Sequence, residues 1–267
     1  MINSSNQNQL NIVIPMAGRG SRFADQGYFQ PKPLIPIHGK PMIEVVIDNL
    51  RPRLPHHFHF VMLREHLENF ELRKLIDKAA PDSTVIAIDE ITDGPACTVL
   101  LVEKYINNDT QLMIANCDQW VDIAINDYLA DFTRQKCDGF IMTMKASDPK
   151  WSFVEFNTTG KIIRIVEKEV VSNEATVGIY NFRRGSDFVR AARQMIAQNF
   201  RVNNEFYVAP TYNQLIHWGM PLGVYSIGSL WNGMYGLGTP SDLERFLSLP
   251  ISRRAAGNNS MMSRAFL

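Results

Sequence analysis

Short apolar runs alternate with longer segments of helical periodicity through the first half of the chain, and this alternation limits the fold more than any other feature. Buried strands are predicted for four runs, at residues 10–16, 57–63, 83–89 and 111–117. Helical patterns lie between them, at 41–50, 64–80 and 95–106. Strands joined through helices pair in parallel by right-handed crossovers. The sequence therefore predicts a parallel α/β sheet with helices on both faces.

The pattern changes after residue 136. Strands are expected in quick succession at 139–146, 151–157, 161–170 and 175–182, and NTTG (157–160) is typical of a hairpin turn. Helices are expected again at 185–198, 204–218 and 239–249, the last with Thr239 as its N-cap. We expect an α/β fold, a Rossmann-like three-layer sandwich with a mixed, mainly parallel central sheet and a small β-rich subregion.

No Pro/Gly-rich linker separates the two halves, so one domain is expected over residues 10–250, with halves at 10–136 and 137–250. Residues 1–9 are polar and predicted to be a disordered lead-in. Residues 251–267 lack periodicity over most of their length and are predicted to be a loose tail or contact arm. Met261 and Met262 in that tail suit a packing or dimer contact.

Charge and cysteine content narrow the classes of function. Lys plus Arg and Asp plus Glu are 27 each, so no global field favours nucleic acid or a membrane surface. The N-terminus lacks the pattern of a signal peptide and no apolar run spans a bilayer, so a cytoplasmic protein is expected. An odd cysteine count without CxxC predicts buried reduced thiols at Cys97, Cys117 and Cys137. A strand edge explains the neighbouring His56, His57 and His59 better than a metal site.

A glycine-rich basic loop follows the first predicted strand, at the sheet edge where α/β proteins bind ligands. Gly18 and Gly20 let backbone N–H groups approach an anion, and Arg22 and Lys32 add charge suited to phosphate. A dinucleotide fingerprint is excluded because Phe23 stands where its third glycine belongs, and no GxxxxGK[ST] loop occurs.

The longer stretch PMAGRGSRF…QPKPLIPIHGKPMIE resembles the signature of the sugar-phosphate nucleotidyltransferases, the GT-A-like NDP-sugar pyrophosphorylases. Further segments agree in order, namely MIANCDQWVD, VEKEVVSNEATVGIYNF and LGTPSDLERF, although Glu169 stands where the family usually has proline. The resemblance covers residues 10–247 and favours a small cytidylyltransferase-like member. It implies transfer of a nucleoside monophosphate from an NTP to a phosphorylated acceptor, with release of pyrophosphate.

The resemblance assigns the phosphate-handling residues. Arg22 would stabilise the departing β- and γ-phosphates, Lys32 would contact the α-phosphate, and Asp118 would hold Mg²⁺. Such a reaction joins two polyanions, so positioning and charge neutralisation dominate its catalysis. The residues expected to cradle the triphosphate are Ala17, Gly18, Gly20 and Ser21.

The resemblance also assigns the two substrate ends. Lys168 would receive the acceptor's phosphate, Gly178 would leave room for the acceptor, and Glu205 would accept a hydrogen bond from its hydroxyl groups. The nucleobase would lie on a loop of small residues, with Thr98 capping the helix behind it. The residues of this base site are Gly94, Pro95, Ala96 and Thr98. CTP is favoured over dTTP or UTP, and the product is expected to serve bacterial surface polysaccharide synthesis.

One departure concerns the metal. Many family members have an aspartate where this chain has Gly236, so a second protein ligand is in doubt, and Asn232 is a nearby candidate. The chain has no hexapeptide-repeat extension, so no fused acyltransferase is expected. Expected partners are the NTP and the phosphorylated small molecule, and a homo-oligomer is left open.

Two alternatives remain. A GT-A glycosyltransferase would give no reason for GxGSR and PKP and would usually carry D-x-D, whereas Asp118 and Asp122 are four residues apart. A non-catalytic nucleotide-binding subunit of the same fold would have no need for Arg22, Lys32, Asp118 and Lys168 together.

Overall fold

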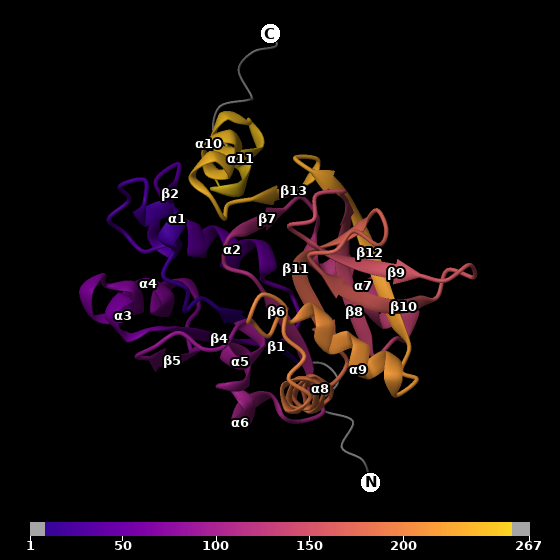
Figure 1. Ribbon diagram of the computed structural model, residues 1–267. Helices are drawn as coiled ribbons and strands as arrows, with labels where there is room; N and C mark the ends of the chain where they lie inside the picture. Colours follow the sequence, from indigo (N-terminus) through magenta and orange to yellow (C-terminus); the bar gives the residue numbers. More distant parts are fainter. Residues whose placement is uncertain (1–8, 258–267) are drawn as a thin grey trace.

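The computed structural model describes residues 9–257, so almost all of the predicted lead-in and the tail methionines Met261 and Met262 lie outside the described residues. A twisted sheet runs through the middle of the molecule with helices on both sides (Figure 1). Its main path has the order β5-β4-β1-β6-β11-β8-β12-β13-β7. This agrees with the predicted mixed, mainly parallel sheet.

The first half of the chain builds the parallel part of the sheet, because β1 pairs in parallel with β4 and β6, and β4 with β5. Its strands are β1 (Leu10–Pro15), β4 (His56–Leu63), β5 (Thr84–Ile88) and β6 (Gln111–Ala115), followed by the short β7 (Gln119–Val121). Its helices are α1 (Ser21–Ala24), α2 (Met42–Leu50), α3 (Arg64–Asn69), α4 (Leu72–Ala79), α5 (Pro95–Leu100) and α6 (Glu103–Ile106), with the 3-10 turn η2 (Lys32–Leu34) and the small hairpin β2 (Pro36–Ile37) and β3 (Lys40–Pro41).

The second half adds the antiparallel part, since β11 is antiparallel to both β6 and β8, while β12 is parallel to β8. Its strands are β8 (Gly139–Lys145), β9 (Ser152–Phe156), β10 (Ile162–Glu167), β11 (Glu174–Phe182), β12 (Leu222–Leu230) and β13 (Gly233–Gly236). Its helices are α7 (Ile125–Gln135), α8 (Gly185–Ala197), η3 (Ala209–Thr211), α9 (Tyr212–His217), α10 (Pro240–Ser248) and α11 (Ile251–Ala255).

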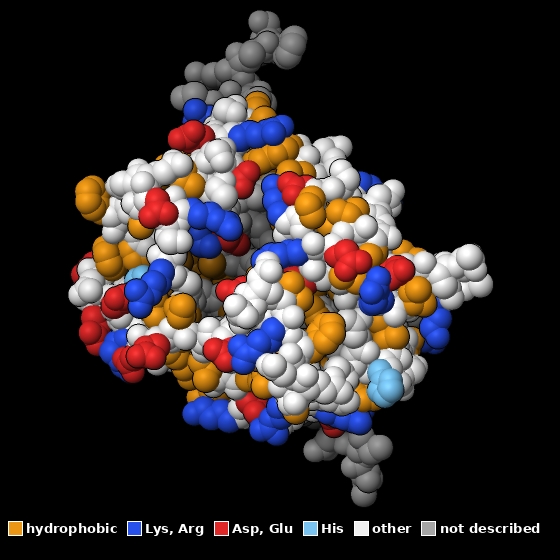
Figure 2. Space-filling view, in the orientation of Figure 1, with side chains coloured by type: hydrophobic (Ala, Val, Ile, Leu, Met, Phe, Trp, Pro, Cys, Tyr) orange, Lys and Arg blue, Asp and Glu red, His pale blue; other side chains and the backbone are white. Residues whose placement is uncertain are grey.

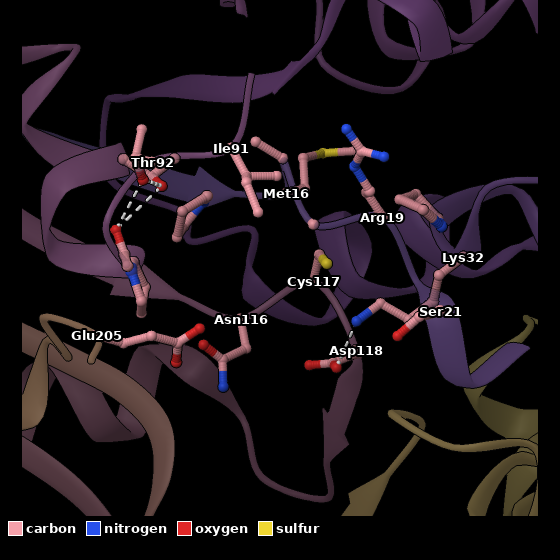
Figure 3. A pocket seen from close by; sticks show the side chains of 17 residues that line it. Met16, Arg19, Ser21, Lys32, Ile91, Thr92, Asn116, Cys117, Asp118 and Glu205 are labelled. Carbon is pink, nitrogen blue, oxygen red and sulfur yellow. Dashed lines mark hydrogen bonds and ion pairs between the residues drawn. The ribbon is translucent and has the colours of Figure 1, made fainter. Parts of the chain in front are cut away.

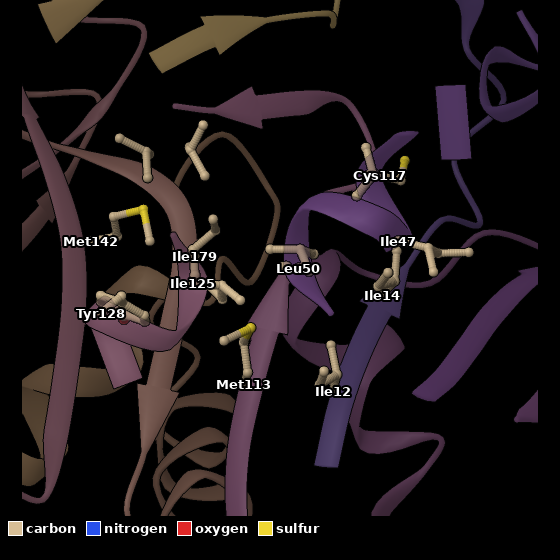
Figure 4. Packing of buried hydrophobic residues seen from close by; sticks show 14 of the residues in the cluster. Ile12, Ile14, Ile47, Leu50, Met113, Cys117, Ile125, Tyr128, Met142 and Ile179 are labelled. Atoms are coloured by element: carbon tan, nitrogen blue, oxygen red, sulfur yellow. The ribbon is translucent and has the colours of Figure 1, made fainter. Parts of the chain in front are cut away.

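Alternation along β1 divides the core between the two faces of the sheet. Ile12 and Ile14 point to a cluster with α2, α4 and α7, shown in part in Figure 4. Val13 points to the opposite cluster, which α5, α8 and α9 complete. Full burial of one such side chain stabilises the fold by about 1.5–3 kcal/mol. Helices therefore cover both faces, as the run pattern predicted.

A third apolar cluster fixes the loops that follow β1. Phe23 from α1 and Ile35 after η2 pack with Trp120 of β7 and Phe246 of α10. Ala256, which follows α11, belongs to the same cluster. The prediction of a loose tail is therefore wrong for residues 251–256, because a short apolar face anchors them.

Three predicted helices differ in the structure. The helix expected at 64–80 breaks at Phe70, because Glu71 takes a left-handed conformation with φ 39°. The helix expected at 95–106 is interrupted at Leu101 and Val102, whose N–H groups donate three residues back instead of four. The helix expected at 204–218 begins only at the 3-10 turn of residues 209–211.

Local turn chemistry is confirmed at two predicted places. Asn157 Oδ1 accepts bonds from the N–H groups of Thr159 and Lys161, and it closes the hairpin between β9 and β10. Thr239 caps α10 by accepting from the N–H of Asp242 at 3.1 Å. Between residues 9 and 257 no helix is long and apolar enough to cross a membrane.

The three cysteines are free thiols; Cys117 and Cys137 are buried as predicted, whereas Cys97 is only half-buried. The histidine run begins β4, an interior strand that pairs with both β1 and β5, so the prediction of a strand edge is wrong. There the His57 ring lies 2.9 Å from the Thr84 hydroxyl and the His59 ring 3.0 Å from Asn11 Oδ1.

Candidate active site

A cavity of about 610 Å³ opens beyond the carboxyl ends of β1 and β6. In the space-filling view the molecule is hollowed near its centre, with basic and acidic side chains around the opening (Figure 2). Its lining combines the loop after β1, the η2 turn, the loop before α5 and the end of β6 (Figure 3). The lining residues are Pro15, Met16, Ala17, Gly18, Arg19, Ser21, Lys32, Pro33, Ile91, Thr92, Gly94, Pro95, Thr98, Asn116, Cys117, Asp118 and Glu205.

The loop after β1 lines this cavity through Ala17, Gly18 and Ser21, as predicted. Gly20 is not a lining residue. It turns the chain into α1 with φ 66°, and a Cβ built on it would lie 3.4 Å from the Lys32 Cβ. Gly20 therefore lets the glycine-rich loop pack closely against the segment that carries Lys32.

Lys32 and Asp118 meet at the floor of the cavity. Nζ of Lys32 donates to Oδ2 of Asp118 at 2.7 Å, and the two side chains remain 21% and 25% exposed. Burial lowers the pKa of the Lys32 ammonium, but attraction to the Asp118 carboxylate and the hydrogen bond to it outweigh burial, so the pKa is raised overall. The lysine is thus a permanent cation at neutral pH, and a ligand can reach both groups.

Arg22 does not line the cavity. It is exposed on α1, and its side chain has no hydrogen bond or ion pair within residues 9–257. Its positive charge acts on both Lys32 and Tyr207, so the guanidinium lies within electrostatic range of the two. Arg22 is therefore near the cavity but is not one of the residues that line it.

The loop before α5 is the predicted base site, and Gly94, Pro95 and Thr98 do line the cavity. Ala96 does not. It is fully buried, and its N–H donates to the carbonyl of Phe206 at 2.9 Å, so the prediction that Ala96 contacts the base is wrong. A Cβ on Gly94 would lie 2.6 Å from the Phe206 nitrogen, so glycine is required by the protein's own packing.

Thr98 does not begin its helix, because Gly94 is the N-cap of α5. Instead the Thr98 hydroxyl lies 3.2 Å from the Gly94 carbonyl and 2.6 Å from the Thr92 hydroxyl. Thr92 was missed by the sequence analysis and adds a hydroxyl to the cavity wall, beside the exposed side chain of Ile91.

Of the three residues predicted to contact the acceptor, only one lines the cavity. Glu205 lines the cavity and points toward Asn116 (Figure 3). Lys168 lies outside the lining, with Nζ donating to the Tyr207 hydroxyl at 2.6 Å. A Cβ on Gly178 would meet Asn116 Nδ2 at 2.2 Å, so this glycine makes room for Asn116 and does not itself line the cavity.

Several lining residues were missed, although two carried a signal. Asn116 and Cys117 are the last two residues of the strand predicted at 111–117 and come directly before Asp118, so their place at the sheet edge could have been inferred. Burial raises the pKa of the Cys117 thiol to about 11, which keeps it protonated and excludes a nucleophilic role at neutral pH. Met16, Arg19 and Ile91 carried no comparable signal.

Gly236, which stands where many family members have the second aspartate, lies near another carboxylate. A Cβ on Gly236 would lie 3.8 Å from Oδ2 of Asp242, and that oxygen accepts from the Thr239 hydroxyl at 2.8 Å. Asn232 lies in an exposed turn outside the cavity. Within residues 9–257 no group of three or more His, Cys, Asp or Glu residues could hold a metal ion.

Comparison with known proteins agrees with this geometry. A family model described as "Nucleotidyl transferase" matches residues 12–206. The chain is 26% identical over 180 residues to the bifunctional protein GlmU of Methanococcus maripaludis, a match that covers 65% of this chain and 40% of that relative. The chain therefore matches less than half the length of that relative.

Solved structures extend the likeness to most of the chain. A nucleoside-diphosphate-sugar pyrophosphorylase from Vibrio cholerae superposes with a TM-score of 0.74 at 27% identity, covering 89% of this chain and 100% of that one. The inositol-1-phosphate CTP transferase of T. maritima shares the fold, with a TM-score of 0.71 at 15% identity over 94% of this chain and 96% of that one. The chain belongs to the nucleotidyl transferase family, in its sugar-phosphate branch.

Proposed function

We propose that this protein transfers a nucleoside monophosphate from an NTP to a sugar 1-phosphate or a similar phosphorylated acceptor. The observation that carries the proposal is the accessible pair of Lys32 and Asp118 on the floor of a cavity bordered by the glycine-rich loop. A cation and a carboxylate side by side suit a phosphate and its metal ion. The backbone of Ala17, Gly18 and Ser21 offers N–H groups to the same anion.

In the proposed reaction an oxygen of the acceptor's phosphate attacks the α-phosphorus of the NTP. The bond from that phosphorus to the bridging oxygen breaks, and pyrophosphate leaves with the electron pair. The acceptor phosphate is already an anion, so no proton has to be removed from it. Lys32 neutralises charge on the α-phosphate, and Arg22 neutralises charge on the leaving group.

The residues fit Mg²⁺ as the metal of the proposed reaction. Mg²⁺ is commonly held by one or two carboxylates together with substrate phosphates and water. Asp118 supplies such a carboxylate, and its Oδ1 has no hydrogen bond within the described part of the chain. Bound there, the ion would polarise the α-phosphate. Asp118 alone would hold it from the protein side.

We infer CTP as the preferred nucleotide, ahead of dTTP or UTP. The small residues Gly94 and Pro95, with the hydroxyl of Thr92, suit a pyrimidine edge. A cytoplasmic role in making precursors of a bacterial surface polysaccharide is consistent with such a product.

The test is a pyrophosphate-release screen of the purified protein with Mg²⁺, each NTP and a panel of sugar, polyol and other small phosphates. Release with one pair is expected, and Lys32→Ala should abolish it. Lys40→Ala is the matched control, because Lys40 of β3 also pairs with an aspartate, Asp48 of α2, and both residues lie outside this cavity. Tight NTP binding without release from any pair would favour a non-catalytic subunit.

A further inference from the structure

Lys168 is held in an unusual backbone conformation next to the cavity. It follows the last residue of β10 with φ 59°, a left-handed value that costs a residue with a side chain about 1 kcal/mol or more. Its N–H donates to the carbonyl of Trp151 at 3.0 Å, and the preceding Glu167 is buried and bonded to the Ser152 hydroxyl. The chain entering Lys168 is thus fixed, and its left-handed backbone sets the direction in which the side chain leaves.

Tyr207 receives that side chain. The Lys168 ammonium donates to the Tyr207 hydroxyl at 2.6 Å and lies 4.8 Å from the centre of the Tyr207 ring. Burial and the carboxylate of Glu205, which lines the cavity, raise the pKa of the same hydroxyl, so Tyr207 stays protonated. A protonated phenol can accept from an ammonium, so Tyr207 holds Lys168 close to the part of the cavity that Glu205 lines.

The position of Tyr207 is set by the nucleotide half of the molecule. Its neighbour Phe206 donates to the carbonyl of Asp93 at 2.8 Å and accepts from the N–H of Ala96 at 2.9 Å. Arg201 reinforces this attachment, because it pairs with Asp93 at 3.0 Å and stacks 4.2 Å from the centre of the Phe206 ring. The loop that is proposed to bind the base therefore also anchors the segment that contains Tyr207, the residue that contacts Lys168.

We propose that Tyr207 is a positioning residue: it holds the Lys168 ammonium at the rim of the cavity, where the phosphate of the acceptor binds. The inference rests on the proposed function for the identity of that phosphate. The positive charge of Arg22 also acts on Tyr207, so two cations act on the surroundings of this hydroxyl and favour an anion at that rim. Tyr207 thereby links the acceptor subsite to the base loop.

The first experiment is kinetic and uses glucose 1-phosphate as the acceptor probe, at saturating concentration of the NTP that supports its fastest turnover. Tyr207→Phe keeps the ring and removes only the hydroxyl. The KM for glucose 1-phosphate should rise about 3- to 10-fold, the worth of one hydrogen bond, with kcat and the KM for NTP nearly unchanged. In a Lys168→Ala background the same change should have no further effect, because both variants break one contact.

The second experiment does not depend on activity. Acetic anhydride labels exposed lysines, and mass spectrometry reports each rate. Tyr207→Leu should speed labelling of Lys168 at least 3-fold and leave Lys104 unchanged. Lys104 is the internal control because its ammonium lies 4.7 Å from the ring centre of Tyr105, outside the cavity lining. Tyr105→Leu should speed labelling of Lys104 and leave the labelling rate of Lys168 unchanged.

The outcomes separate this inference from the proposed function. A wild-type protein that turns over glucose 1-phosphate, with an unchanged KM in Tyr207→Phe, overturns the positioning role. Additive effects of Tyr207→Phe and Lys168→Ala overturn it as well. If no substrate pair releases pyrophosphate, the proposed function fails, and the labelling decides alone: faster labelling of Lys168 supports the positioning by Tyr207, and an unchanged rate overturns it.

Discussion

Lys32 donates a hydrogen bond to Asp118 at 2.7 Å, although 86 positions separate the two residues in the chain. The contact joins the η2 turn after β1 to the end of β6, and β1 and β6 are neighbours in the parallel sheet. Parallel strands bring their carboxyl ends to one edge, so residues from distant loops meet there. The fold thus brings the segment of Lys32 and the segment of Asp118 together at one site.

Asp118→Asn should separate the role of this pair in catalysis from its role in stability. The amide keeps the shape of the side chain but removes the charge that would hold Mg²⁺ and balance Lys32. We expect kcat/KM to fall about 100-fold or more. The free energy of unfolding should change by less than about 1 kcal/mol, because the pair is partly exposed.

Asp48→Asn is the matched control, since it breaks the Lys40–Asp48 ion pair away from the cavity. It should leave kcat/KM unchanged. Steady-state pyrophosphate release and urea denaturation measure the two quantities. Wild-type turnover in Asp118→Asn would contradict the role assigned to the aspartate.

Gly94→Ala should damage the attachment of residues 203–206 to the base loop. Gly94 has φ 128°, and the new Cβ would lie 2.6 Å from the nitrogen and 2.7 Å from the oxygen of Phe206. Neither backbone atom can move without breaking its own bond. We expect a loss of about 2 kcal/mol or more in the free energy of unfolding, together with weaker NTP binding.

Gly160→Ala provides the comparison for Gly94→Ala. Gly160 also has a positive φ, 79°, but a Cβ there meets nothing within 4 Å. Its cost should therefore be the backbone strain alone, about 1 kcal/mol, with NTP binding intact. Equal losses in urea denaturation of the two variants would show that the contact with Phe206 is unimportant.

The sequence predicted the site residues whose positions depend on strand order. It did not predict those whose positions depend on contacts between distant loops. The α/β alternation and the residues after β1 and β6 placed Ala17, Gly18, Ser21, Lys32 and Asp118 correctly, because strand ends follow directly from the run pattern. The burial of Ala96 could not be predicted in this way. It depends on the docking of Phe206, more than a hundred residues later, onto the base loop.

The break at Glu71 shows a second limit of the sequence. The helical period of residues 64–80 continues across it, so periodicity predicted one helix there. The left-handed turn at Glu71 divides that period, and the second helix packs Leu72 and Ile76 into the same core as α2. Tertiary packing therefore decides the break, which local propensity does not reveal.

Cysteine reactivity tests the electrostatics of the cavity. Burial raises the pKa of Cys117 and of Cys137 to about 11; it also raises the pKa of Cys97, but that side chain is only half-buried and so more accessible. Only the thiolate reacts with iodoacetamide. At pH 8 native protein should be modified at Cys97 first, about 10-fold faster than at the other two.

Mass spectrometry of the modified peptides gives the three rates, and unfolding in guanidinium is the control, since it should make them alike. Native Cys117 reacting as fast as Cys97 would mean that its thiol is not protected at the cavity floor.

His59 should make the stability of the protein depend on pH. Burial and the neighbouring His57 lower the pKa of His59 to about 3, and the ring is held between Asn11 and the Tyr105 ring. The unfolded chain has an ordinary histidine pKa of about 6.5 and takes up a proton below it, whereas the folded protein does not. This histidine therefore costs nothing above pH 6.5 and lowers the stability progressively as the pH falls toward 3.

The expected loss from His59 between pH 7 and pH 5 is about 2 kcal/mol. His59→Gln cannot take up that proton, so its free energy of unfolding should fall less over the same interval, by about that amount. Urea denaturation of both proteins at the two pH values gives the difference. Burial also lowers the pKa of His57 and of His66. Both proteins contain these two histidines, so their effect on the free energy of unfolding cancels in the difference. Parallel pH dependence in the two proteins would place the proton uptake on other groups.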